Sequence, residues 1–177
     1  GLLAPSDHDY KVSDGGARYV RSFAGGLRAE THFKAVRDGV WERRDWLRNE
    51  RPHPIRLTGV ESRFDLGRGV YELYTQAGGW CTESQGQWEA LTHGRRILAC
   101  EHGRTSQGST PFLGVRCAGN DCGVAFHLLP RENWRIEVET HRDAGWRACD
   151  LTLRFGPADD DGLQLFLQPG EEYALPS

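Results

Sequence analysis

The sequence lacks several features that would assign it to a common class of proteins. No apolar run approaches the roughly 20 residues needed to cross a bilayer, so we expect no membrane partner. The net charge of -3 provides no positive field that would attract phosphates, so we expect no nucleic-acid partner either. Methionine is absent even from the first position, and lysine occurs only at Lys11 and Lys34. We therefore expect a processed or excised chain.

Disulfide and helix signals are also missing. Five cysteines, an odd number, argue against a disulfide framework, so we expect reduced thiols and a cytoplasmic protein. No ten-residue segment keeps an unbroken 3.6-residue period. The best helical candidate, Phe33 to Leu47, is interrupted by Asp38 and Gly39, which fit a hairpin turn better. We predict strands over 33–37 and 40–43 on either side of that turn.

Short alternating segments dominate what is present. The 22 glycines and eight prolines separate runs in which every second residue is apolar. These runs are 55–59, 60–66, 124–128, 134–138, 149–155 and 163–167. They predict an all-β chain with little or no helix, arranged as an antiparallel sandwich or barrel. The length of 177 residues favours one domain, which we place at 19–177 after a loosely ordered, polar segment at 1–18.

One group of residues has the chemistry of a metal site without its spacing. Cys117, Cys122 and His127 are spaced C-x4-C-x4-H, whereas structural zinc sites usually need four ligands with tighter cysteine pairs. Residues 118–121 have the composition of a hairpin turn. We therefore predict a pair of cross-strand thiols and expect neither a metal nor a cofactor. Cys81 has no base at a diagnostic spacing, so we predict a buried thiol beside Trp80.

The chain carries no recognisable catalytic set. It has no G-x-S-x-G elbow, no phosphate-binding glycine loop and no carboxylate pair revealed by spacing. Its aromatic residues are more informative, because flat rings with polar neighbours stack on the apolar faces of sugars. The candidates are Tyr74, Trp80, Trp88 and Trp134. Core packing is the alternative explanation for all four.

The order of motifs from Trp41 onward resembles a known family. The matching segments are 45–50, 54–57, 61–66, 71–74, 79–83, 103–106, 111–112, 126–128, 133–138 and 167–176. Together they resemble the N-terminal β-sandwich domain of glycoside hydrolase family 36, the α-galactosidase (melibiase) and raffinose-processing group. The resemblance extends from Tyr19 to Ser177.

The resemblance implies an antiparallel supersandwich that precedes a (β/α)8 catalytic barrel. Both catalytic aspartates of the family belong to that barrel, so this chain would have no catalytic residue and would be inactive alone. The expected partners are the barrel of the parent chain, further copies in a homo-oligomer, and galactosides. We expect the domain to pack on the barrel, to aid assembly and to contribute a loop near the sugar site.

Four positions that match the family pattern are candidate substrate-binding residues. Trp80 would stack on a sugar, Glu83 would accept from a hydroxyl or pair with Arg104, and Arg104 would donate as a planar fork. Phe112 completes the group. The alternative is a buried Trp80 with a Glu83–Arg104 pair that pins the loop.

Two segments depart from the family pattern, namely 129–132 and the first 18 residues. They allow a divergent member with another glycosidic specificity, or a related non-catalytic protein. Two further functions stay open on other grounds: a stand-alone carbohydrate-binding module and a small free-standing β-sandwich enzyme.

Overall fold

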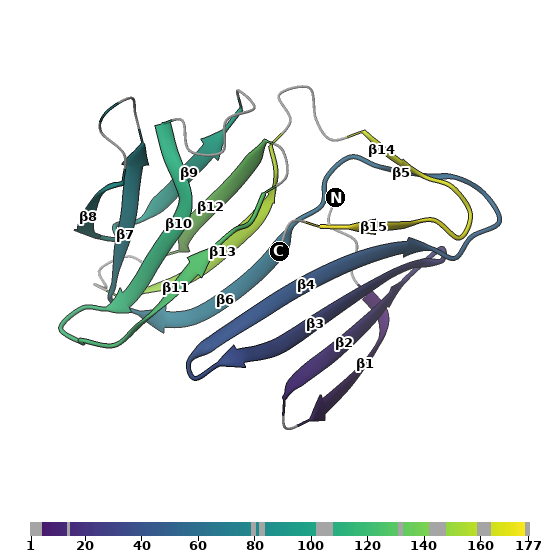
Figure 1. Ribbon diagram of the computed structural model, residues 1–177, viewed down its shortest axis with the longest axis horizontal. Coiled ribbons are helices and arrows are strands. Elements are labelled where there is room, and N and C mark those ends of the chain that lie inside the picture. The colour runs from purple at the N-terminus through teal and green to yellow at the C-terminus, as the bar shows by residue number, and fades with distance from the viewer. Residues whose placement is uncertain are drawn as a thin grey trace. The chain divides into compact units, whose positions relative to one another are not determined.

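The computed structural model describes residues 5–13, 15–78, 81, 84–101, 108–130, 133–141, 148–158 and 164–175. All regular structure in these residues is β-strand, arranged in four antiparallel sheets (Figure 1). The predicted all-β antiparallel fold is therefore confirmed. The described part of the chain contains no helix long and apolar enough to span a membrane. The chain divides into two compact units: unit 1 is Gly1–Val60 with Gly162–Ser177, and unit 2 is Glu61–Asp161.

Unit 1 is built on a five-stranded sheet with the order β1-β2-β3-β4-β15 and a two-stranded sheet of β14 and β5. Its strands are β1 (Pro5–Ser13), β2 (Gly16–Phe23), β3 (Leu27–Arg37), β4 (Val40–Asn49), β5 (Ile55–Leu57), β14 (Leu165–Leu167) and β15 (Glu172–Ala174). The predicted hairpin at 33–43 is confirmed as the tip of the longer β3–β4 hairpin, with Gly39 at φ +72 in its turn. Where we expected a loosely ordered segment up to residue 18, β1 pairs with β2 over its whole length.

The two faces of the five-stranded sheet differ in chemistry. Residues opposite each other in an antiparallel pair point to the same side, and register therefore fixes the composition of each face. One face carries the bidentate Arg18–Glu30 pair, with distances of 2.6 and 2.7 Å. The other face buries Leu27, Ala29 and Leu47 against Leu57 and neighbouring apolar residues.

Unit 2 is a sandwich of two four-stranded sheets, with the orders β11-β10-β7-β8 and β6-β13-β12-β9. Its strands are β6 (Ser62–Gly69), β7 (Tyr71–Gly78), β8 (Gln85–Ala90), β9 (Gly94–Cys100), β10 (Gly108–Cys117), β11 (Gly123–His127), β12 (Trp134–His141) and β13 (Cys149–Pro157). One buried cluster joins the inner faces, because Leu73 and Leu113 of the first sheet belong to it with Ile136 and Leu153 of the second. The predicted sandwich is therefore present in this unit.

Period-two alternation explains which side chains form this core. Trp134, Ile136 and Val138 are buried on β12, and Arg135 and Glu137 point to the other side of the sheet. The alternating residues of β13 from Cys149 to Phe155 behave in the same way. Each sheet of unit 2 consequently has an outer face that the core does not use.

Candidate functional site

The predicted site residues are only partly within the described structure. Trp80, Glu83 and Arg104 lie outside the described residues. Phe112 lies on β10 and is half-buried, on the side opposite the core residue Leu113. It therefore belongs to the outer face of sheet β11-β10-β7-β8, where it lies near other aromatic residues.

Three aromatic side chains gather on this outer face because of strand register. Tyr74 on β7 is paired with Trp88 on β8, and Phe112 on β10 is paired with His127 on β11. The Tyr74 ring centroid lies 5.4 Å from that of Trp88 and 6.1 Å from that of Phe112. These separations are typical of interacting aromatic rings. We name Tyr74, Trp88 and Phe112 the aromatic platform.

Two glycines make room for the platform. A Cβ atom at Gly86 would lie 1.9 Å from the Tyr74 hydroxyl oxygen, so only glycine fits beneath that ring. A Cβ atom at Gly114 would lie 3.3 Å from Tyr74 Cβ and 3.5 Å from Trp88 Cη2. The rings of Tyr74 and Trp88 therefore extend across the backbone of neighbouring strands instead of standing away from the sheet.

Charged and polar side chains hold the platform in place. The guanidinium carbon of Arg116 lies 4.1 Å from the centroid of the Trp88 ring. Arg116 Nε also donates to Glu72 Oε2 at 2.6 Å. Gln76 Nε2 donates to the Tyr74 hydroxyl at 3.2 Å, and the Thr110 hydroxyl donates to Gln76 Oε1 at 3.2 Å. The platform is thus fixed before any ligand arrives.

A hollow of about 370 Å³ lies over the platform. Its lining includes all three rings, Arg116 and Asp121. Trp88 remains 43% exposed within it. Sites for small molecules commonly have volumes of roughly 300–1,000 Å³, apolar walls and a few placed polar groups. The hollow therefore has the size and composition to hold one flat, partly apolar ligand.

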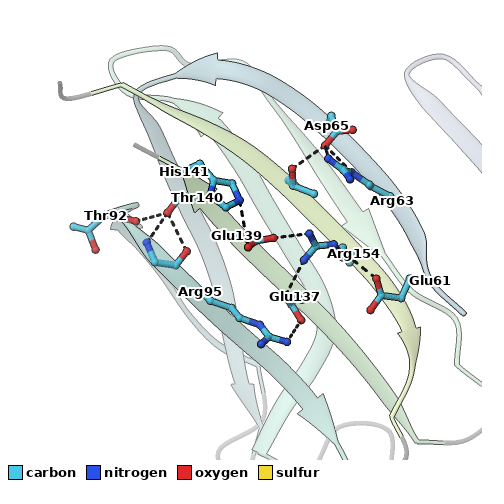
Figure 2. A network of polar contacts seen from close by, with 12 residues as sticks. Glu61, Arg63, Asp65, Thr92, Arg95, Glu137, Glu139, Thr140, His141 and Arg154 are labelled. Carbon is cyan, nitrogen blue, oxygen red and sulfur yellow. Dashed lines mark hydrogen bonds and ion pairs between the residues drawn. The ribbon is translucent and has the colours of Figure 1, made fainter. Parts of the chain in front are cut away.

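The outer face of the second sheet has a different chemistry, shown in Figure 2. Glu137 is only 4% exposed and pairs with Arg95, with Arg135 at 3.2 Å and with Arg154 at 2.8 Å. Burial opposes its ionisation, but the hydrogen bond from Arg95 and the nearby arginine charges outweigh burial and lower the pKa of Glu137. A carboxylate held ionised in this way serves as a structural anion and not as an acid–base group.

The structure overturns the prediction for Cys81 and decides between the two explanations given for Trp134. Cys81 is exposed, not buried, because it lies in the connection between β7 and β8 at φ 60 and not on an inward strand position. Trp134 is fully buried, so core packing is the correct explanation for that candidate sugar-stacking residue. Cys117 and Cys122 flank the β10–β11 turn as predicted, and both are free and exposed. Among the described residues, no group of three potential ligands could hold a metal ion.

Arg116, Gly86 and Gly114 were missed by the sequence reasoning. Alternation along β10 could have placed Phe112, Gly114 and Arg116 on one side of a strand. Their contacts with Tyr74 and Trp88 depend on the register between strands, for which the sequence provides no simple signal.

Comparison with known proteins assigns the chain to a family. The sequence profile of the Glycosyl hydrolase family 36 N-terminal domain matches residues 21–148. The chain belongs to this family. The family resemblance inferred from the order of its motifs is therefore confirmed. No match was found among curated protein sequences.

Solved structures show that the fold of this chain also occurs in known α-galactosidases. The α-galactosidase AgaA from Geobacillus stearothermophilus aligns with 99% of this chain at a TM-score of 0.81 and 18% identity. The α-galactosidase from Lactobacillus brevis aligns with 98% at 0.78 and 16% identity, and the galactosidase domain of AgaSK with 98% at 0.78 and 14% identity. The family 36 domain spans only 26–27% of the length of these structures.

Proposed function

We propose that this family 36 domain is the non-catalytic N-terminal part of an α-galactosidase-type glycoside hydrolase. Its unit 1 packs on the catalytic barrel of the same chain and aids assembly. The observation that carries this function is an apolar sheet face in unit 1 that its own core covers only in part. The similar α-galactosidases support it, since about three quarters of each lies beyond the part aligned with this chain.

The uncovered part of that face continues the buried part. Register places Val12 on β1, Phe33 on β3 and Trp41 on β4 on the side that also carries Leu27 and Leu47. We name Tyr10, Val12, Phe33 and Trp41 the docking face. The exposed fractions are 69% for Tyr10, 70% for Val12 and 58% for Trp41. Contiguous exposed apolar residues of this kind mark interaction surfaces.

One arginine, Arg43, lies between the covered and uncovered parts and is paired with Asp45. Arg43 places its guanidinium carbon 5.5 Å from the Phe33 ring centroid while its Nε donates to Asp45 at 2.9 Å. Asp45 is buried and also accepts from the Thr31 hydroxyl. These contacts fix the docking face as a rigid apolar surface with its polar groups already satisfied, which favours a protein partner.

The test begins with the gene region downstream of the Ser177 codon. We expect it to encode a (β/α)8 barrel, which would be expressed separately and mixed with this chain for calorimetry and light scattering. The double variant Val12→Ser with Trp41→Ser should weaken association at least tenfold, since burying each apolar side chain contributes about 1.5–3 kcal/mol. The variant Ile97→Ser, which changes an exposed residue of unit 2, should have no effect.

An authentic stop codon after Ser177, or a barrel that does not associate, would reject this function. Self-association of the chain through the same face, without barrel binding, would instead identify the docking face as an oligomer interface.

We also propose a cytoplasmic location, supported by the five free cysteines. Protein from the native source, unfolded without reductant, should then present five reactive thiols.

A further inference from the structure

We propose that the hollow over the aromatic platform of unit 2 binds a pyranose ring of a neutral saccharide. The proposal is independent of barrel docking, because the docking face lies in unit 1 and the platform in unit 2. Its three rings come from adjacent strands of one rigid sheet. Binding would make this domain a saccharide-holding module in addition to an assembly element.

The ligand class follows from the pairing of flat rings with hydrogen-bonding groups. A pyranose has an apolar C–H face and a rim of hydroxyls, so it needs an aromatic surface and fixed donors and acceptors nearby. Trp88 offers that surface with 43% of its area exposed. Arg116 and Asp121 line the same hollow and supply a donor fork and a carboxylate acceptor.

The charges in the hollow select against an anionic ligand. Arg116 is already neutralised by Glu72 at 2.6 Å, and Asp121 adds a negative charge. The chain as a whole has a net charge of -3. Among the described residues that line the hollow, a phosphate or a nucleic acid would therefore meet no free positive charge, whereas an uncharged sugar meets no electrostatic penalty.

Preorganisation distinguishes the platform from aromatic residues that are merely exposed. The Gly86 position leaves no space for a side chain under the Tyr74 ring, and the Gly114 backbone lies close to the Tyr74 and Trp88 side chains. The Tyr74 hydroxyl is fixed by Gln76, and Trp88 is held between Tyr74 and Arg116. A site fixed before binding loses less conformational entropy when the ligand arrives.

The other outer face of unit 2 differs from the platform face in how its polar groups are used. There the arginines and carboxylates around Glu137 pair with one another (Figure 2). Such mutual pairing leaves little hydrogen-bonding capacity for a ligand. The platform face instead combines satisfied polar groups with an exposed ring, an arrangement suited to stacking.

The experiment is a titration of the 177-residue chain with galactose, melibiose and raffinose, followed by calorimetry and by ¹H–¹⁵N NMR. Mannitol serves as the control ligand, because it carries similar hydroxyls but has no pyranose ring. We expect binding in the millimolar range or tighter for at least one sugar and none for mannitol. The Trp88 indole signal and the Gly114 and Ala125 amide signals should shift on binding.

Variants separate a platform site from binding elsewhere. Trp88→Ala should weaken affinity at least tenfold, whereas Phe166→Ala, which removes an exposed aromatic ring of unit 1, should leave it unchanged. If Trp88→Ala unfolds the chain, the NMR signal shifts of the unaltered protein show whether the sugar binds at the platform. No binding of any of the three sugars, equal binding of mannitol, or shifts that spare Trp88 and Gly114 would each overturn the proposal.

Discussion

Arg116 lies over the Trp88 indole, 4.1 Å from the ring centroid. The same guanidinium pairs with Glu72, so Arg116 contacts both a carboxylate and the aromatic platform. Stacking of a guanidinium on a partly exposed indole contributes about 0.5–1 kcal/mol. The Glu72 pair adds little by itself, because both side chains are partly exposed.

We predict that Arg116→Ala lowers the free energy of unfolding by about 1 kcal/mol. It should also weaken the near-ultraviolet circular dichroism signal of the freed indole. Arg116→Lys should lose most of the same signal, because an ammonium group lacks the planar stacking surface. Arg63→Ala, which disrupts an exposed pair with Asp65, is the control and should change neither measurement. An unchanged dichroism signal in Arg116→Ala would show that Arg116 does not hold Trp88.

The buried Glu137 gives the largest expected effect on stability. Glu137→Ala removes the shared partner of three arginines and should lower the free energy of unfolding by about 3 kcal/mol, measured by urea denaturation. Asp65→Ala, in the same unit, removes an acid that is 58% exposed and should cost about 1 kcal/mol or less. Equal losses in the two variants would contradict the structural role assigned to Glu137.

Glu30 should titrate far below an ordinary glutamate. The hydrogen bond from Arg18 lowers its pKa from 4.5 to about 2, against an opposing effect of burial. Because the folded pKa lies below the unfolded one, its contribution to stability is present above pH 4.5 and is lost as the pH falls toward 2. NMR titration of the Glu30 carboxyl in Arg18→Ala should show a pKa nearer 4.5, whereas Arg28→Ala should change it less. A Glu30 pKa near 4.5 in the unaltered chain would refute the pairing.

Gly86 should tolerate no side chain while Tyr74 lies across it. Gly86→Ala forces the Tyr74 ring to move, at a cost of about 1–3 kcal/mol, and should disturb the aromatic circular dichroism signal. Gly59→Ala is the matched control, because its Cβ atom would meet no atom within 4 Å. If both variants were equally stable, the Tyr74 ring would not occupy the position described.

The sequence predicted those parts of the fold in which alternation and burial agree. The inward residues of β12, from Trp134 to Val138, were predicted as one face because the strand buries one side completely. β1 was missed because it is an edge strand whose residues are all exposed, so its alternation of polar and apolar residues marks no core. Cys81 was placed wrongly because burial is not predictable at a turn.

Prediction of the site was limited by contacts across strands. Tyr74 and Trp88 were recognised as residue types that stack on sugars, but their contact follows from the β7–β8 register. Arg116 and the two glycines acquire a role only when three strands are aligned. Phe112 was named through the family resemblance and lies in the same platform, and its role in substrate binding stays a prediction.

The proposal that this domain is non-catalytic and assists a catalytic barrel is tested most directly by measuring the release of galactose from raffinose. The assay compares the purified 177-residue chain, the separate barrel and an equimolar mixture of the two. We predict no turnover by the chain alone and more turnover by the mixture than by the barrel alone. Turnover by the 177-residue chain, abolished by a single carboxylate substitution within it, would contradict a non-catalytic domain.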